Sequence, residues 1–273
     1  MLKKIGRLDN EAKKEIIGLL DTIYNLLDDN KKAKAEKKLL ELSATPNYFI
    51  REFVGKELIN YRDQRKIMPI AKKMLSHRLY GIRATALFYF YQRYIDDAEK
   101  MIDILEDTFE NVPWEAESII NEMWKRYPDL MKERMKKWVQ SDNSKKRALS
   151  FHGMENIAHS DPAFIMEFIS EAIDDDTMEV QKKITHILTQ VARVNPIIVF
   201  PYIREWLCEA NEKRIKTIWV SMKKLANIVI QKNRREKSQE FVLLTQQTIN
   251  DWLNDENENV SKMGERLFHI IRS

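Results

Sequence analysis

The chain has 273 residues, of which 44% are hydrophobic and 10% aromatic, so it can bury a core and is not an intrinsically disordered protein. It contains only six glycines and seven prolines, against roughly 7% and 5% in average usage, and no Asn-Gly or Asp-Gly pair. These numbers exclude a turn-rich β-protein. The net charge of +4 is a mild bias that neither requires nor excludes a nucleic-acid partner.

Helical segments recur along the chain at a fixed spacing. In chain order, Asp96 opens DDAEKMIDILEDTF, and Pro128, Pro162 and Pro196 open PDLMKERMKKWV, PAFIMEFISEAI and PIIVFPYIREWL, at steps of 32, 34 and 34 residues. Proline is favoured in the first turn of a helix because its missing N–H would have no partner there. These four residues therefore mark equivalent helix starts.

A second helix is expected after each of these, following a short polar turn. Its aligned positions step by 32, 32, 32, 34, 34 and 46 residues through Ile50, Ile82, Trp114, Lys146, Val180, Arg214 and Val260. The last step contains QKNRREKSQEF, which predicts an insertion near residues 231–245. A period of this length with two amphipathic helices per unit predicts an all-α fold, an α-solenoid of HEAT-like repeats (α-α superhelix). We expect one domain over residues 1–273, with about seven helix pairs and the aromatic stretch Leu87–Tyr94 in the core.

The signatures of most enzyme classes are missing. The sequence holds no phosphate-binding loop, dinucleotide-binding glycine pattern, nucleophile elbow or paired-histidine zinc motif. His152 and His159 share one helical face, but two ligands make a weak metal site, so we expect no metal and no cofactor. The single cysteine, Cys208, suits a reducing compartment. With no apolar run of about 18 residues and no signal-peptide core, we expect a cytoplasmic protein that has no membrane contact and is a monomer.

Basic side chains recur near the start of the second helices. Arg51, Arg83, Arg147 and the pair Lys182–Lys183 fall at equivalent places, and Lys145 and Lys146 adjoin Arg147. In a curved stack these cations would form a row along a concave groove and could follow a phosphate backbone. The alternative is that each cation pairs with an acid of the neighbouring repeat.

Two segments in the middle of the chain carry motifs of a known family. Trp138–Arg147 (WVQSDNSKKR), followed by Ala148, and Val180–Pro196 (VQKKITHILTQVARVNP) resemble W-x-x-S-D-N-x-x-x-x-R-A and I-Q-K-A-I-x-W-x-L-R-x-x-x-x-x-N-P of the AlkD-like DNA alkylation repair proteins. The resemblance spans about Trp114 to Trp206. It implies a HEAT-like solenoid that binds duplex DNA in a basic concave groove and hydrolyses the N-glycosidic bond of N3- or N7-alkylated purines.

The resemblance also implies an active site. The family has a Trp, an Asp four residues later and an Arg in the next repeat, which here points to Trp114, Glu117 and Arg147 as catalytic residues. Glu117 lies three residues after Trp114 and Ser118 lies four after it, so Glu117 takes the place of the acid only if one residue has been deleted. His186 falls where the family has a second Trp and is a further candidate contact to DNA.

Three functions are compatible with these residues. The first is a DNA-binding protein that excises alkylated purines, with Arg51, Arg83, Lys145, Lys146, Lys182, Lys183 and His186 on the DNA. The second is a scaffold without catalysis that holds an acidic or helical protein partner on the same face. The third is a relative that binds a DNA structure and has lost the glycosylase activity. Salt bridges from the named cations to neighbouring repeats would count against DNA.

Overall fold

The structure, a computed structural model, describes residues 6–231, 235 and 237–272. Over these residues the chain forms fifteen α-helices and two short 3-10 helices, with no β-strand. None of the described helices is both long and apolar enough to cross a membrane. The contacts divide the chain into two compact units, a first unit up to Ile119 and a second unit from Ile120. The boundary falls inside one helix, and a single continuous domain stays a prediction.

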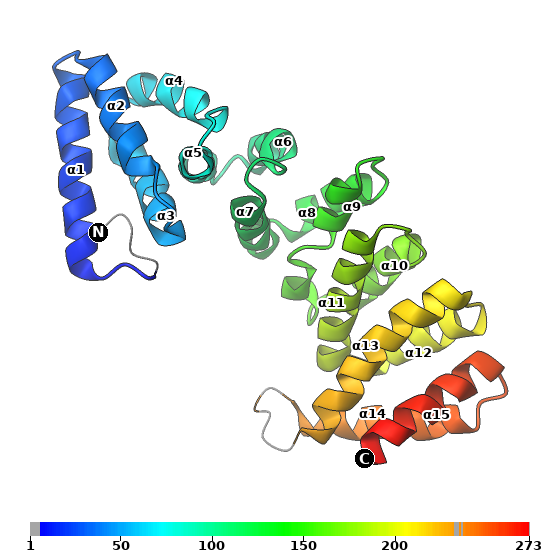
Figure 1. Cartoon of the computed structure of the whole chain (residues 1–273). Coiled ribbons are helices and arrows are strands. Elements are labelled where there is room, and N and C mark those ends of the chain that lie inside the picture. The colour runs from blue at the N-terminus through cyan, green and yellow to red at the C-terminus, as the bar shows by residue number, and fades with distance from the viewer. Residues whose placement is uncertain (1–5, 232–234, 236, 273) are drawn as a thin grey trace. The chain divides into compact units, whose positions relative to one another are not determined.

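The first unit is a stack of antiparallel helices, coloured from blue to green in Figure 1. Its helices are α1 (Asn10–Asp28), α2 (Lys32–Ser43), α3 (Tyr48–Glu57), η1 (Leu58–Asn60), α4 (Gln64–Leu75), α5 (Tyr80–Arg93), α6 (Ala98–Thr108) and the first half of α7 (Pro113–Arg126). Helix α1 packs on α2 and α3, α3 packs on α5, and α4 packs on α5. Neighbouring pairs therefore share one apolar core through their second helices.

The second unit repeats this scheme from the green to the red part of Figure 1. Its helices after α7 are α8 (Pro128–Val139), α9 (Ser144–Ser150), η2 (Met154–Ile157), α10 (Pro162–Ala172), α11 (Met178–Val194), α12 (Pro196–Cys208), α13 (Glu212–Ile230), α14 (Gln239–Leu253) and α15 (Glu258–Arg272). The second helices α9, α11, α13 and α15 pack each on the next, and α8, α12 and α14 pack on their own partners. Each unit is thus an all-α stack of HEAT-like pairs, which confirms the predicted fold class.

The helix boundaries follow from local sequence chemistry. Pro128, Pro162 and Pro196 are the first residues of α8, α10 and α12, as the repeat predicts. Asn47 and Asn143 cap α3 and α9 by accepting main-chain N–H groups of the first turn, which would otherwise lack partners. The connection from α13 to α14 runs through the predicted insertion near 231–245; of this segment, residues 232–234 and 236 lie outside the described residues and 239–245 belong to α14.

The close contact between α3 and α5 depends on a glycine. A Cβ atom at Gly55 would lie 2.5 Å from the carbonyl oxygen of Thr85 and 2.6 Å from the Cβ atom of Phe88. The missing side chain lets the two backbones approach. The α5 side of this contact belongs to the aromatic stretch predicted as core, of which residues 87–91 are each at most 7% exposed. The core therefore sits where the second helices meet.

Candidate functional site

Three arginines occupy one repeat position, the fourth residue of the second helix of a pair, and they make the same hydrogen bonds. In each, Nη1 donates to two main-chain carbonyls five and six residues earlier, at distances between 2.7 and 3.2 Å. The pairs are Arg51 with Thr45 and Pro46, Arg83 with His77 and Arg78, and Arg147 with Ser141 and Asp142. These carbonyls belong to the turn between the two helices of a pair. Each guanidinium therefore holds its own turn against its own helix.

Arg51 also forms a buried ion pair. Its Nη2 and Nε donate to Oε1 of Glu115 at 2.6 and 3.2 Å, and the two side chains are 5% and 0% exposed. The other carboxylate oxygen of Glu115 accepts the hydroxyl hydrogen of Tyr80 at 2.5 Å. Burial, and then this hydrogen bond, raise the pKa of Tyr80. The structure thus corrects the expectation that Arg51 is an exposed member of a row of cations. The positive charge of Arg51 is buried and is neutralised by Glu115.

Arg147 is paired across repeats as well. Its Nε and Nη2 donate to the carboxylate of Asp175 at 2.7 and 3.4 Å, and Nη2 also donates to Oγ1 of Thr177 at 3.1 Å. The two charged side chains are 20% and 9% exposed. Burial alone would raise the pKa of Asp175, but the hydrogen bonds from Arg147 and Thr177 outweigh it and the pKa is lowered. For Arg147 the structure therefore shows the alternative named from the sequence, in which a cation pairs with an acid of the neighbouring repeat. The catalytic role of Arg147 stays a prediction.

Arg83 differs from these two. Besides its own turn it donates Nε and Nη2 to the carbonyl oxygen of Asn111, at 3.3 and 3.1 Å. All four of these bonds end on neutral carbonyls, so none of them pairs the guanidinium with a carboxylate, although Asp107 lines the same cavity as Arg83. Arg83 also borders a cavity of about 540 Å³ with Lys72, His77 and Arg78. Of the three equivalent arginines, Arg83 is the one best placed to attract an anion.

Trp114 and the acids that follow it lie at the start of α7. Trp114 is 72% exposed, the largest exposed fraction among the described large hydrophobic side chains. Helix α7 runs without interruption from Pro113, so no bulge moves Glu117 into the place four residues after Trp114. Ser118 occupies that place, and its hydroxyl lies 2.8 Å from the hydroxyl of Tyr48. Glu117 is half-buried on the neighbouring face of the same turn.

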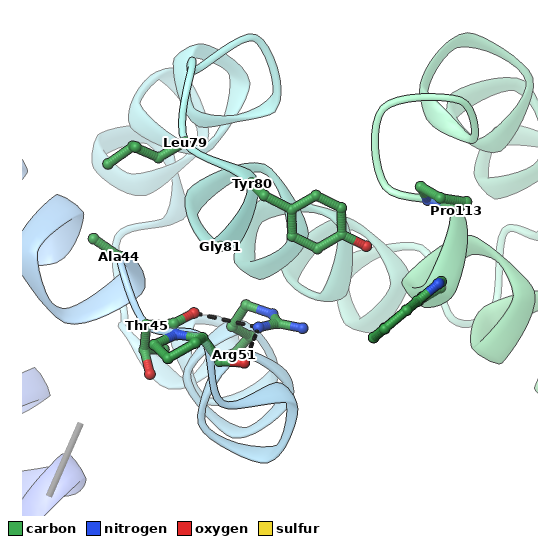
Figure 2. A pocket seen from close by; sticks show the side chains of 9 residues that line it. Ala44, Thr45, Arg51, Leu79, Tyr80, Gly81 and Pro113 are labelled. Atoms are coloured by element: carbon green, nitrogen blue, oxygen red, sulfur yellow. Dashed lines mark hydrogen bonds between the residues drawn. The ribbon is translucent and has the colours of Figure 1, made fainter. Parts of the chain in front are cut away.

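A pocket of about 570 Å³ adjoins Trp114 in the first unit (Figure 2). It is lined by the turn before α3, the start of α5 and the start of α7, namely Ala44, Thr45, Pro46, Arg51, Leu79, Tyr80, Gly81, Pro113 and Trp114. The Tyr80 ring lies over the Arg51 guanidinium, whose Cζ is 5.5 Å from the ring centroid. A Cβ atom on Gly81 would be 2.6 Å from the carbonyl oxygen of Thr45, so a glycine is needed for α5 to start against this turn.

The remaining predicted contacts lie in the second unit, on α9 and α11, which pack together. Lys145, Lys182 and His186 are exposed. Lys146 holds its Nζ 5.5 Å from the ring centroid of Trp138, and the Nζ of Lys183 lies 3.2 Å from Nδ1 of His152. The structure therefore groups Trp114, Glu117, Arg51 and Arg83 in the first unit, and Arg147 with these five residues in the second; it describes the two groups separately.

Sequence reasoning named Lys182 but missed two exposed lysines that form a row with it in the second unit. Lys182, Lys216 and Lys262, the lysine row, lie two residues after the aligned positions Val180, Arg214 and Val260. They stand on α11, α13 and α15, which pack side by side. All three side chains are exposed, and Lys262 pairs with Glu258 one turn earlier. The repeat alignment contained this signal, but one position away from where we looked for it.

A tryptophan with two cations lies on the same helices. The Cζ of Arg266 is 3.8 Å from the ring centroid of Trp219, and the Nζ of Lys223 is 5.9 Å from it. Arg266 comes 80 residues after His186, the sum of the last two repeat steps, and so occupies the same position in its own repeat. Both cations are attracted to the π-electrons of the tryptophan ring, so the pair of contacts fixes Arg266 on α15 against α13.

Comparison with known proteins identifies the family. The pattern of the family described as DNA alkylation repair enzyme matches residues 41–225, more than half of the chain. No curated protein matches the sequence significantly. An engineered protein has 16% identity and a TM-score of 0.40, covering 96% of this chain and 71% of its own; a designed armadillo repeat protein in complex with the peptide (KR)4 has 16% identity and a TM-score of 0.33, covering 80% and 98%. The fold assignment rests on the helix pairs themselves, and the chain belongs to the DNA alkylation repair enzyme family.

Proposed function

We propose that the protein binds duplex DNA and excises N3- or N7-alkylated purines from it, with Glu117 as the carboxylate at the reacting sugar. The observation that carries this proposal is Trp114, a large aromatic side chain left 72% exposed at the start of α7, with Glu117 one turn later, in a chain of this family. Trp114 also lines the pocket beside the start of α5, so its exposed ring is available to a ligand in that groove.

The chemistry asks little of the protein. An alkylated purine already carries a positive charge, so when the N-glycosidic bond breaks, the bonding electron pair leaves with the base and neutralises it. The sugar becomes an oxocarbenium-like cation, which a carboxylate stabilises, and water adds to the anomeric carbon and loses a proton. Glu115 is unsuited to this task because both its oxygens are engaged by Arg51 and Tyr80 in the interior. Glu117 is the acid on this turn of α7 that reaches the surface.

Exposed cations hold the DNA in this proposal. The lysine row and Lys145 in the second unit offer positive charges to the phosphates, and the exposed imidazole of His186 on α11 offers a hydrogen-bonding group. Arg83 does the same in the first unit, because its hydrogen bonds end on neutral carbonyls. Arg51 and Arg147 act indirectly in this proposal, since they fix the turns before α3 and α9.

The test measures base release and binding together. Methylated duplex DNA is incubated with the parent protein and with Glu117→Gln; Glu122→Gln, also on α7 and ion-paired with Lys125, is the matched control. We expect Glu117→Gln to slow release by roughly 10²–10³-fold, the typical loss for a charge-stabilising group, and Glu122→Gln to leave it unchanged. Equal rates for the two variants would rule out Glu117 as the carboxylate. If the affinity for DNA does not fall as the salt concentration rises, the proposal that basic side chains bind the DNA backbone is wrong.

Ser118 favours a second candidate function, DNA binding without excision. It stands four residues after Trp114, where the family resemblance places the acid, and it is held by Tyr48. A hydroxyl cannot supply the negative charge that the sugar cation needs. Steep salt-dependent binding of DNA with no released base from the parent protein would select this candidate over the first. Restoring an acid with Ser118→Asp would then test whether the position alone is limiting.

A further inference from the structure

The two helix layers of the second unit carry opposite charges. The first helices α10, α12 and α14 pack in a row, and the second helices α11, α13 and α15 pack in another. The first-helix layer holds five Asp and Glu residues against one Arg, whereas the second-helix layer holds eleven Lys and Arg residues against four Glu. A polyanion is therefore attracted to the second helices and repelled by the first. A ligand of the first-helix layer must have a different chemistry.

The first-helix layer contains an apolar groove of about 360 Å³ between α12 and α14. The buried rings of Phe200 and Trp252 line it and meet edge to face, with their centroids 6.5 Å apart. Ile197 lines it from α12 and is 64% exposed, and Leu244 lines it from α14 and is half-buried. Aliphatic and aromatic side chains thus lie open to solvent on both sides of the groove, which is typical of a surface that binds a partner.

The charge left at the rim of this groove is negative. The Nε and Nη2 atoms of Arg204 donate to the carboxylate of Asp255 at 2.6 and 3.1 Å, so the one base of the layer is neutralised. Asp251 also lines the groove, is exposed, and has no ion-pair partner among the side chains that the structure describes. The exposed carboxylate of Glu205 follows Arg204 on α12. A partner therefore gains from a positive charge beside its apolar contact.

The shape of the groove favours a helix. A furrow between two neighbouring helices accepts the ridge that side chains four residues apart form on a third helix. A second copy of this chain is disfavoured as the occupant, because a two-fold contact through the groove would place the acidic layers of two copies against each other. An amphipathic helix with lysine or arginine next to its apolar stripe satisfies both the furrow and its rim.

We propose that the groove between α12 and α14 docks a basic amphipathic helix of a partner protein. Its aliphatic side chains lie against Ile197, Phe200 and Leu244, and a lysine or arginine lies beside Asp251. This inference depends neither on excision nor on DNA binding. It also leaves the basic second helices available, so the protein can hold DNA and the partner at the same time.

The experiment uses three fluorescently labelled synthetic helical peptides of equal length. The first has leucines four residues apart flanked by lysines, the second has glutamates in place of the lysines, and the third has alanines in place of the leucines. We expect the leucine–lysine peptide to bind the parent protein roughly 10-fold or more tightly than either of the others. Burial of one leucine side chain alone is worth about that factor, and glutamates are repelled by the acidic layer. Fluorescence anisotropy measures the three affinities.

Variants of the protein assign the binding to the groove. Ile197→Gln should weaken binding of the leucine–lysine peptide roughly 10-fold. Leu243→Gln is the matched control and should not change it, because Leu243 is 60% exposed on α14 but does not line the groove. Asp251→Asn should weaken binding by up to about fivefold and reduce its dependence on salt. Its matched control is Glu240→Gln, an exposed acid of the same helix outside the groove.

The outcomes separate this inference from the proposed function. Peptide binding by a parent protein that does not bind DNA would support the groove while DNA binding fails. Equal affinity for the three peptides, or equal effects of Ile197→Gln and Leu243→Gln in variants that circular dichroism shows folded, would mean that the groove is not the docking surface. A parent dimer in sedimentation velocity that Ile197→Gln dissociates would assign the groove to a second copy instead. A lower affinity for duplex DNA in Ile197→Gln or Asp251→Asn would overturn the inference in favour of DNA on this face.

Discussion

Removing the carboxylate of Glu115 should destabilise the first unit strongly. Glu115 is 0% exposed and receives three hydrogen bonds, two from Arg51 and one from Tyr80. In Glu115→Ala the guanidinium of Arg51, 5% exposed, keeps its charge but loses its counter-ion. Breaking one side of a buried pair costs about 3–5 kcal/mol, against roughly 5–15 kcal/mol for the whole stability of a domain. We expect a loss near the middle of the first range.

The magnitude depends on the stranded charge and not on the value of the pair itself. In a buried setting, replacing both partners with apolar residues of similar size is often neutral or stabilising. Arg51→Met combined with Glu115→Leu should therefore be more stable than Glu115→Ala alone, although it also forfeits the bonds of Arg51 to its own turn, worth about 1 kcal/mol each.

Urea unfolding followed by circular dichroism measures these differences. The chain has two compact units, so the curves are fitted with a separate transition for each, and only the transition of the first unit should move. A loss below about 1 kcal/mol in Glu115→Ala would refute the reasoning, because the ion pair would then be solvated and of the ordinary surface kind. The reasoning is also refuted if the destabilisation of the double variant equals the sum of the destabilisations of Arg51→Met alone and Glu115→Leu alone.

Two further outcomes follow from the contacts. Because the pKa of Asp175 is lowered in the folded chain, its ionised form adds stability above the unfolded pKa of about 3.9, and this is lost as the pH falls through the folded pKa. Unfolding of the second unit should thus become easier below about pH 4, and Asp175→Asn should flatten that dependence; an unchanged slope would contradict the ion pair with Arg147. In Gly81→Ala, the new Cβ atom meets the carbonyl oxygen of Thr45 at 2.6 Å, which should cost about 1–3 kcal/mol in urea unfolding and shift the start of α5; a neutral effect would show that this turn is free to move.

The repeat could be predicted from sequence because its signals are local. Proline at a helix start and a polar turn after it act within one or two turns of chain, so Pro128, Pro162 and Pro196 locate α8, α10 and α12 directly. The division into two units could not be predicted in this way. It falls inside α7, at Ile119, where neither composition nor a linker marks a boundary.

The roles of the arginines could not be predicted, because a sequence shows the type of a side chain but not its partner. Arg51 and Arg83 stand at the same repeat position and bind their own turns in the same way. Arg51 nevertheless forms a buried ion pair with Glu115, whereas Arg83 donates its remaining hydrogen bonds to a neutral carbonyl. Glu115 itself stands at that repeat position, one residue after Trp114 as Arg51 follows Ile50. Opposite charges at equivalent positions were the available signal that these side chains bind one another across the stack.

That register also says where charges for a partner should be sought. The side chains of Arg51, Arg83 and Arg147 face the turn of their own repeat. Their hydrogen bonds to that turn stabilise the fold, whatever the protein binds. The position one residue later points outward in the second unit, where it carries the exposed lysine row. Side chains at the outward position can be substituted without loss of stability only while the side chains at the inward position hold the helices in place. In the second unit the arginine of this kind is Arg147 on α9, whereas the lysine row stands on α11, α13 and α15. Substituting Arg147 should therefore lower the stability of the second unit, while substituting lysines of the row should lower the affinity for DNA.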